Sequence, residues 1–264
     1  MKLSGKVALV TGSARGLGRA YAHHLARLGA DVVINDVDMA AAKVYDEELT
    51  AATVMDEVRA LGVRSLGIVA DVTDQAKVRS MIDEIVAEFG QIDILVNNAG
   101  GALVPGPSYA SSVPEADFRR MMDINLMGTI FCCQAVAEPM KRQRGGRIVN
   151  VGSQAGLRSQ GGGGGTGYSV AKAAIHHYTR KLADELGPFG INVNCIAPGW
   201  ILSSRAVAGG RGSPESRARH EAEIALRRLG VPEDCAKVVE FLVTDLSDYV
   251  TGQIIPICGG VCLF

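Results

Sequence analysis

The stretch VALVTGSARGLG, residues 7–18, decides the fold class of this chain. It begins with four apolar residues typical of a buried strand, and apolar residues at helical spacing follow its last glycine. Gly12, Gly16 and Gly18 allow a tight turn between the two elements and a close approach of the backbone to a ligand. Free N–H groups at the start of the helix can then hold a phosphate. A glycine-rich turn between a first strand and a helix indicates a pyrophosphate site for a dinucleotide.

The rest of the chain alternates apolar strands with helices in the same way. Seven short apolar runs are expected to be strands: residues 7–10, 32–34, 65–69, 92–96, 147–151, 191–196 and 253–257. Between them lie segments with apolar residues at helical spacing, the later ones at 115–140, 166–186 and 215–228. Short apolar strands separated by helices are typical of a parallel sheet covered on both faces. We therefore expect an α/β protein with a Rossmann-like, doubly wound fold and a seven-stranded parallel sheet.

Length and composition exclude several classes of protein. Of the 264 residues, 47% are hydrophobic and 21% are charged, which excludes a disordered or fibrous protein. The formal net charge of −1 offers no basic field to nucleic acid or to an anionic membrane, so neither is an expected partner. No composition break divides the chain. We expect one domain, residues 1–264, with a cofactor half at about 1–152 and a catalytic half at about 153–264.

Apolar runs and cysteines bear on the compartment. No apolar run approaches the ~18–20 residues of a membrane span, and no secretory signal is expected. The six cysteines form neither a Cys-x-x-Cys pair nor a zinc-type spacing with histidine, so we expect buried, reduced thiols and no metal. The adjacent histidines at 23–24 and 176–177 point to different faces of a helix and do not change this expectation. A cytoplasmic protein is predicted.

A carboxylate at the end of the second predicted strand indicates which dinucleotide binds. Asp36 follows the glycine-rich turn by about 20 residues, where a carboxylate accepts hydrogen bonds from the hydroxyls of the adenosine ribose. Its charge would repel the 2′-phosphate of NADP, and Asp38 adds to that repulsion. Arg15 has the opposite tendency, because an arginine in this turn can help to hold a phosphate. Since the negative charge lies where the 2′-phosphate would go, we predict NAD as the cofactor.

Four polar residues point to acid/base chemistry. Among six tyrosines, only Tyr168 has a lysine four residues later, so the phenol and the Lys172 ammonium share one face of a helix. A phenol with a pKa near ~10 is a poor base at neutral pH, and a neighbouring cation lowers that value. Ser153 ends the fifth predicted strand, where a hydroxyl can hold a substrate oxygen. Asn125 places a polar group inside an otherwise helical stretch.

The turn and these four residues together resemble the short-chain dehydrogenase/reductase family. Residues 11–18 are similar to its Thr-Gly-x3-Gly-x-Gly turn, and the four residues resemble its Asn-Ser-Tyr-Lys tetrad. The resemblance implies that Tyr168 is the acid/base on the alcohol or carbonyl oxygen and that Ser153 orients that oxygen. It implies that Lys172 binds the nicotinamide ribose and lowers the pKa of Tyr168, while Asn125 holds a water in a proton relay to Lys172. It also implies a homotetramer or homodimer packed through the helices at 115–140 and 166–186.

Further motifs extend the resemblance over residues 2–261. Residues 71–72 are similar to the family's adenine-contacting pair, 97–100 to its Asn-Asn-Ala-Gly motif, and 198–199 to the Pro-Gly that precedes contacts with the nicotinamide amide. Ile201 would supply a backbone contact there, and Ser203 stands where the family often has threonine. The implied cofactor-binding residues are Gly12, Arg15, Gly16, Leu17, Gly18, Asp36, Asp71, Val72, Asn98, Ala99, Gly100, Tyr168, Lys172, Pro198, Gly199, Ile201 and Ser203.

The chain departs from the family pattern in three places. Residues 40–53 look like an insertion, which we expect to lengthen a helix at the adenosine edge. The glycine run at 161–165 lengthens the segment between Ser153 and Tyr168, and we expect a loop of no catalytic consequence. Cys258 stands where the family has an aspartate before two glycines.

These observations predict an NAD-dependent oxidoreductase that transfers a hydride between NAD(H) and a secondary alcohol or ketone, with Tyr168 as general acid/base. Two alternatives stay open. A reductase of 3-oxoacyl thioesters would use NADPH, which Asp36 argues against. A non-catalytic NAD(H)-binding protein would not need Tyr168 together with Lys172.

Three loops are expected to line the substrate pocket, at residues 101–108, 154–160 and 200–217. Trp200 lies either at the rim of the pocket or in the core. The loops contain Arg158, Arg205 and Arg211, which could bind an anionic substrate, although arginines that face solvent are the commoner arrangement.

Overall fold

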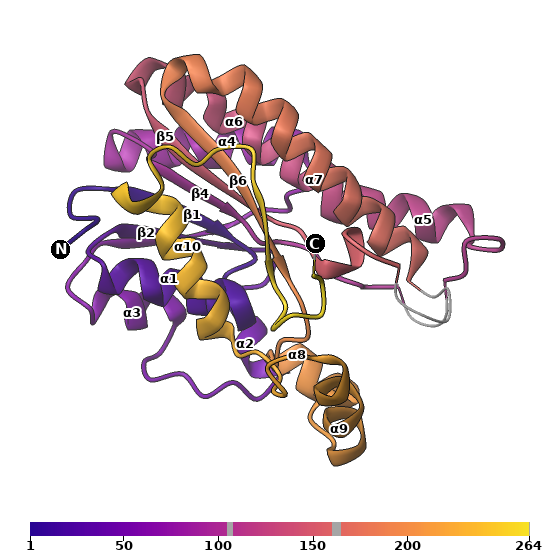
Figure 1. The fold of residues 1–264 in the computed structure, drawn as a ribbon. Helices are drawn as coiled ribbons and strands as arrows, with labels where there is room; N and C mark the ends of the chain where they lie inside the picture. The colour runs from indigo at the N-terminus through magenta and orange to yellow at the C-terminus, as the bar shows by residue number, and fades with distance from the viewer. Residues whose placement is uncertain (105–107, 160–164, 264) are drawn as a thin grey trace.

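The predicted strands form one parallel sheet in the order β3-β2-β1-β4-β5-β6-β7. The computed structural model describes residues 1–104, 108–159 and 165–263. The chain crosses from β3 on one side of β1 to β4 on the other, which is the reversal that defines a doubly wound sheet (Figure 1). The predicted fold class is thereby confirmed. The strands are β1 (Val7–Thr11), β2 (Asp31–Asp36), β3 (Ser65–Val69), β4 (Ile94–Asn97), β5 (Gly146–Val151), β6 (Ile191–Pro198) and β7 (Ile254–Ile257).

Strand boundaries differ from the prediction by at most two residues. β4 begins at Ile94, two residues later than predicted, because the chain before it forms a turn in which the Asp93 carboxylate accepts a hydrogen bond from the Val7 N–H at 2.9 Å. Ile92 is buried, although it lies outside the strand. Apolar character at this position therefore reflects burial and not strand pairing.

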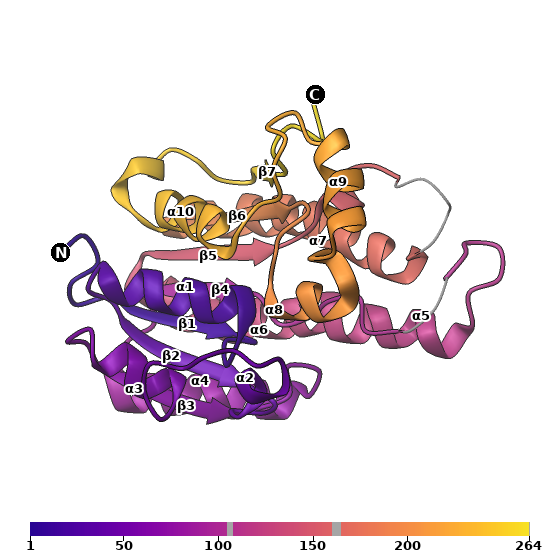
Figure 2. The ribbon, with the colours of Figure 1, turned by 90° about the horizontal axis from the view of Figure 1, so that it is seen from below.

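Helices cover both faces of the sheet, as Figures 1 and 2 show. One face packs against α1, α3 and α10, and the other against α4, α6 and α7. The first turn of α7 and the two short helices α8 and α9 lie beyond the carboxyl ends of the central strands (Figure 2). The helices are α1 (Gly16–Arg27), α2 (Ala41–Val44), α3 (Val54–Arg59), α4 (Gln75–Phe89), α5 (Glu115–Met122), α6 (Gly128–Gln143), α7 (Thr166–Leu186), α8 (Ser204–Ala206), α9 (Pro214–Glu223) and α10 (Pro232–Val243).

Helix α4 illustrates how local sequence sets an element. Its buried residues Val78, Met81, Ile82 and Ile85 fall on one stripe at helical spacing. The Asp74 carboxylate accepts hydrogen bonds from the two N–H groups of residues 76 and 77 and so caps the first turn. The last turn ends at residue 90, a glycine in the left-handed region with φ 81°.

Three helix predictions need correction. The stretch 115–140 is two helices joined by a π-helical turn, Asp123–Met127. The stretch 215–228 is helical only to Glu223, because Ile224 turns extended and is buried in the core. The segment 40–53 does not lengthen a helix: it forms the one-turn helix α2 and then an irregular strap up to residue 53.

Two further findings concern cysteines and membranes. All six cysteines are free, and five of them are buried. Within residues 1–104, 108–159 and 165–263, no helix has the length and the apolar character needed to cross a bilayer.

Candidate active site

A cavity of about 1220 Å³ opens at the carboxyl ends of the strands, at the reversal point of the sheet. Nearly all of the predicted site residues line it, from Asp36 beside β2 to Tyr168 on α7. Two do not. Gly18 packs beneath the glycine-rich turn, and Asn125 lies behind the loop that follows β4. The predicted residues that do line the cavity are Gly12, Arg15, Gly16, Leu17, Asp36, Asp71, Val72, Asn98, Ala99, Gly100, Ser153, Tyr168, Lys172, Pro198, Gly199, Ile201 and Ser203.

The glycine-rich turn packs too tightly for side chains at two of its glycines. A Cβ on Gly12 would lie 2.8 Å from the Cα of Ala99, and a Cβ on Gly18 would lie 2.2 Å from the Gly12 carbonyl oxygen. The Asn98 amide ties the turn to the loop after β4, donating to the carbonyls of Thr11 and Gly12 at 2.9 and 2.8 Å.

Gly16 is different, because open space faces it. It begins α1 with a φ of 59°, and the nearest atoms to an added Cβ are 4.0 Å away. A side chain here would project in front of the free N–H groups at the start of α1. The turn is therefore a backbone cradle of the shape and polarity that a diphosphate requires.

Asp36 is fixed at the far end of the cavity by backbone donors. Its two carboxylate oxygens accept hydrogen bonds from the N–H groups of Ala14 at 3.2 Å and Val37 at 2.8 Å. Burial raises the pKa of Asp36, and these hydrogen bonds together with the charge of Arg15 oppose the rise. The Arg15 guanidinium itself lies over the ring of Tyr45, 4.3 Å from its centroid.

The strap at residues 45–53 contacts the glycine-rich turn. The sequence did not predict this contact. The Glu47 carboxylate accepts a hydrogen bond from the Gly16 N–H at 2.8 Å, pairs with Arg19 at 3.2 Å and contacts the Ser204 hydroxyl. Arg19 also pairs with the buried Glu57 at 2.6 Å. No local sequence pattern predicts these contacts, because each joins residues that are 28 to 157 positions apart.

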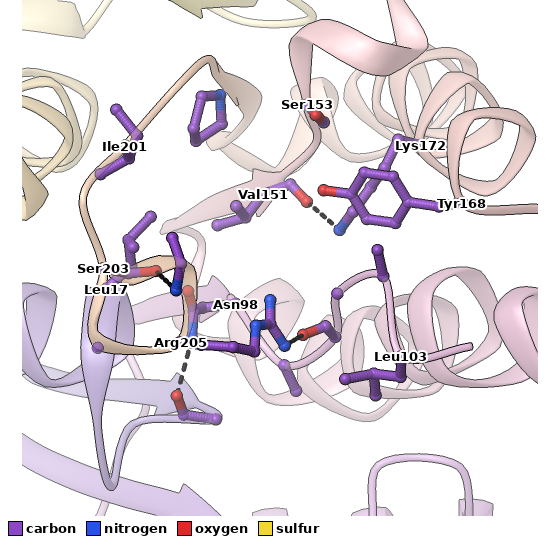
Figure 3. A pocket seen from close by; sticks show the side chains of 18 of the residues that line it. Leu17, Asn98, Leu103, Val151, Ser153, Tyr168, Lys172, Ile201, Ser203 and Arg205 are labelled. Atoms are coloured by element: carbon purple, nitrogen blue, oxygen red, sulfur yellow. Dashed lines mark hydrogen bonds between the residues drawn. The ribbon is translucent and has the colours of Figure 1, made fainter. Parts of the chain in front are cut away.

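Ser153, Tyr168 and Lys172 converge at the other end of the cavity, as Figure 3 shows. Ser153 caps the 3-10 turn Gln154–Gly156 that follows β5, and its hydroxyl accepts a hydrogen bond from the Ala155 N–H at 3.2 Å. Tyr168 lies in the first turn of α7 and Lys172 one turn later. The Lys172 Nζ lies 5.7 Å from the centroid of the Tyr168 ring and donates to the Val151 carbonyl at 2.7 Å.

Burial shifts both titratable groups toward their neutral forms. It lowers the pKa of Lys172 from 10.5 to about 8. It raises the pKa of Tyr168, and three groups work against that rise: a hydrogen bond with Ser153 and the positive charges of Arg205 and Arg211. The charges of Arg205 and Arg211 therefore favour the Tyr168 phenolate, and the lowering of its pKa by Lys172 stays a prediction.

Asn125 is completely buried in the π-helical turn between α5 and α6. Its amide oxygen accepts from the Gly101 N–H at 2.8 Å, and its amide nitrogen donates to the carbonyls of Gly101 and Met121, both at 3.1 Å. The side chain therefore holds the loop after β4 in position. A water relay from Asn125 to Lys172 stays a prediction.

The loop after β6 closes the cavity from the opposite side. A Cβ on Gly199 would lie 2.8 Å from Cys258, so the cysteine at the family's aspartate position packs directly under this loop. Ser203 caps α8, and its hydroxyl accepts from the Ala206 N–H at 3.4 Å. Trp200 is half-buried, lines the cavity and stacks on His220, which places it at the rim.

Parts of the predicted pocket loops also line the cavity, including Leu103, Gln154, Arg205 and Arg211. Arg158 does not line it and instead pairs with Glu223 at 3.6 Å. Residues 105–107 and 160–164, which include most of the predicted glycine loop, lie outside the described residues.

Comparisons with known proteins agree with this geometry. The family profile described as enoyl-(acyl carrier protein) reductase matches residues 12–262. The chain is 49% identical to cyclohexanol dehydrogenase of Rhodococcus sp. (strain TK6), over 99% of this chain and 97% of that protein. It is 42% identical to the (2S)-[(R)-hydroxy(phenyl)methyl]succinyl-CoA dehydrogenase subunit BbsD of Thauera aromatica, over 100% of this chain and 99% of that protein.

The fold is likewise similar to solved structures. A 7α-hydroxysteroid dehydrogenase in complex with NADH and 7-oxo glycochenodeoxycholic acid superposes with a TM-score of 0.87 at 34% identity, covering 98% of this chain and 95% of that one. A short-chain type dehydrogenase/reductase from Mycobacterium marinum superposes with a TM-score of 0.88 at 33% identity, covering 100% and 98%. With its glycine-rich turn, its doubly wound sheet and these relatives over its whole length, the chain belongs to the short-chain dehydrogenase/reductase family of oxidoreductases, which use a nicotinamide cofactor.

Proposed function

We propose that this protein is an NAD-dependent dehydrogenase that oxidises a secondary alcohol to a ketone, or reduces the ketone, with Tyr168 as the general acid/base. The observation that carries the proposal is the arrangement of one cavity. Its far end holds Asp36 beside a diphosphate cradle, and its near end holds Ser153, Tyr168 and Lys172. A ring alcohol is the first substrate class to test, because the chain is 49% identical to a cyclohexanol dehydrogenase.

Each group of the near end has one task in this mechanism. The Tyr168 oxygen takes the hydroxyl proton as the carbon loses its hydride, and it returns that proton in the reverse reaction. The Ser153 hydroxyl, which forms a hydrogen bond with Tyr168, would donate its single proton to the reacting oxygen of a bound substrate and so hold that oxygen beside Tyr168. The Lys172 ammonium, anchored on the Val151 carbonyl, would bind the nicotinamide ribose and lower the pKa of Tyr168. The nicotinamide supplies the hydride chemistry itself.

Asp36 supports NAD over NADP. Its carboxylate is held by backbone N–H groups at the end of the cavity, so it cannot move away from a 2′-phosphate without breaking those hydrogen bonds. The same argument opposes the alternative of a 3-oxoacyl thioester reductase that uses NADPH. The assembly into a homotetramer or homodimer is part of the proposal, and a molar-mass measurement in solution tests it.

The test is NADH formation from NAD and, separately, NADPH formation from NADP, with cyclohexanol and other secondary alcohols. Tyr168→Phe should lower kcat/KM by about 100- to 10,000-fold, the usual contribution of a general acid/base. Tyr178→Phe is the matched control, since Tyr178 lies on the same helix and outside the cavity. Preference for NADP would overturn the Asp36 argument. Tight NADH binding without turnover of any alcohol or ketone would instead favour the non-catalytic alternative.

A further inference from the structure

The two ends of the cavity carry opposite charges. Among the described residues that line it, the only carboxylates are Asp36 and Asp71, which lie at the end beside β2 and β3. Arg15 lies near Asp36 at that end, and the rest of the cavity is lined by cations without a carboxylate: Arg120, Lys172, Arg205, Arg211 and Arg219. This cationic part is where the proposed reaction takes place, so the inference below rests on the proposed function.

The arginines of the cavity differ from their neighbours in having no counter-ion. Two arginines close by in the sequence but outside the cavity are paired, Arg158 with Glu223 and Arg217 with Glu221. In the described part of the chain, none of the five arginines that line the cavity lies within 4.0 Å of a carboxylate oxygen. Their charge is therefore available to a ligand.

Arg211 is supported by a stack of rings. Its guanidinium lies over Trp200, 5.1 Å from the ring centroid, and donates to the Ile201 carbonyl at 2.8 Å. Trp200 in turn stacks on His220, with ring centroids 4.0 Å apart and planes inclined by 24°. A guanidinium has five N–H donors in a planar fork, and the Ile201 carbonyl uses one of them. The stack thus presents the remaining donors in a fixed orientation.

Arg205 and Arg211 occupy different stretches of the cavity. Arg205 reaches the Gly100 carbonyl at 3.3 Å, and the charge of Arg15, in the glycine-rich turn, acts on it (Figure 3). The charges of Tyr168 and Arg205 act on Arg211, and Tyr168 acts on Arg205 as well, whereas Arg15 acts on Arg205. Arg205 therefore lies between the turn and Arg211, and the charges of both arginines act on Tyr168. A diphosphate on the turn can neutralise Arg205, but it leaves Arg211 without a partner.

We propose that the substrate carries a carboxylate and that Arg211, held by Trp200 and His220, binds it while Tyr168 acts on the alcohol or ketone oxygen. A planar carboxylate matches the fork of a guanidinium, which favours bidentate binding. The substrate class is then a hydroxy acid or the corresponding oxo acid.

The test compares matched pairs of alcohols: 3- and 4-hydroxycyclohexanecarboxylate against their methyl esters, with cyclohexanol as a reference. With saturating NAD, kcat/KM should be about 10- to 100-fold higher for the better acid than for its ester, the range of a charge-assisted hydrogen bond. Arg211→Gln should remove this preference, and Arg211→Lys should keep part of it, because lysine retains the charge but not the fork. The control is Arg217→Gln, outside the cavity, which should leave the preference unchanged.

A binding measurement makes the test independent of turnover. Calorimetry with cyclohexanecarboxylate on the NADH complex should show affinity that Arg211→Gln lowers by the same factor. Circular dichroism reports whether the variant is folded, because the fluorescence of Trp200 responds to the loss of the stacked guanidinium itself. Equal rates for acid and ester in the wild type would overturn the inference and leave the proposed dehydrogenase intact. A higher kcat/KM for the hydroxycyclohexane phosphonate than for the carboxylate would also overturn the inference. So would loss of the preference for acid over ester in Arg205→Gln but not in Arg211→Gln. No turnover of any of these alcohols would refute the proposed function instead.

Discussion

Replacing Asp36 by asparagine should shift the preference between NADH and NADPH. The carboxylate is held by the N–H groups of Ala14, Val37 and Asp38, so it stays fixed at the end of the cavity. Two unit charges about 4 Å apart repel each other by about 4 kcal/mol at an effective dielectric constant near 20. Because the site is open to solvent, we expect about 2–4 kcal/mol of discrimination against a 2′-phosphate, which corresponds to roughly 30- to 1000-fold in Kd.

The substitution keeps the size of the side chain and removes its charge. Asparagine can still accept from the Val37 N–H, but its amide nitrogen cannot accept from the Ala14 N–H, which costs about 1 kcal/mol of stability. NADPH should therefore bind roughly 30-fold tighter or more, while NADH should bind several-fold weaker, because the ribose hydroxyls lose a charged acceptor. In the wild type, added salt should weaken the discrimination, since screening acts on the repulsion.

Dissociation constants for both cofactors, from energy transfer between Trp200 and the bound dihydronicotinamide, measure this effect without any substrate. Asp38→Asn is the matched control, because Asp38 is exposed and does not line the cavity. A ratio of NADPH to NADH dissociation constants that changes by less than about 3-fold in Asp36→Asn would refute the electrostatic reasoning. An equal change in Asp38→Asn would refute the assignment to Asp36.

Three further predictions concern stability and the glycine-rich turn. Burial lowers the pKa of Lys172 from 10.5 to about 8, so between these pH values the folded chain holds fewer protons than the unfolded chain. The free energy of unfolding should therefore rise with pH by about 3 kcal/mol over that window. Urea denaturation at pH 8 and 10 should show a smaller rise in Lys172→Met than in the wild type, and an equal rise in both would contradict this origin. Glu47→Gln should lower the free energy of unfolding by about 1–2 kcal/mol, because it removes the carboxylate at the start of α1. It should also tighten NADH binding a few-fold, because that carboxylate competes with a diphosphate for the Gly16 N–H. Calorimetry measures the NADH affinity, and weaker binding in the variant would show that Glu47 only supports the turn. Gly18→Ala should lower the free energy of unfolding by about 1–3 kcal/mol, because the added Cβ would clash with the Gly12 carbonyl oxygen. Gly145→Ala is the control: no atom lies within 4 Å of the added Cβ, so the same denaturation series should show a change of less than about 0.5 kcal/mol.

Sequence reasoning succeeded where the determinants of structure are local. The strand, turn and helix at residues 7–18 were predictable because apolar runs and glycine spacing act within a few residues. The placement of Tyr168 and Lys172 on one helix face followed from a four-residue spacing. The doubly wound sheet followed from the alternation of such local patterns, because a parallel sheet needs helical crossovers.

It failed where distant contacts decide the conformation. The helix expected at 215–228 ends at Glu223, because burying Ile224 and Leu229 gains more than continuing the helix. The strap at 45–53 has no periodicity of its own and is fixed by ion pairs of Arg19 with Glu47 and Glu57. The influence of Arg205 and Arg211 on Tyr168 could not be derived either, because it depends on how the loop after β6 folds across the cavity.

The balance of charge in the cavity connects cofactor choice, catalysis and substrate. Burial alone favours a neutral Tyr168 phenol and a neutral Lys172 amine, which is the wrong state for a base that must accept a proton from an alcohol. Arg205 and Arg211 oppose that tendency at Tyr168, at the cost of placing two like charges in one cavity. An unpaired, half-buried arginine is costly, and an anionic ligand relieves the cost. On the two proposals above, the same cations that favour the phenolate also favour a negatively charged substrate, and the charge of Asp36 is expected to exclude the 2′-phosphate of NADP.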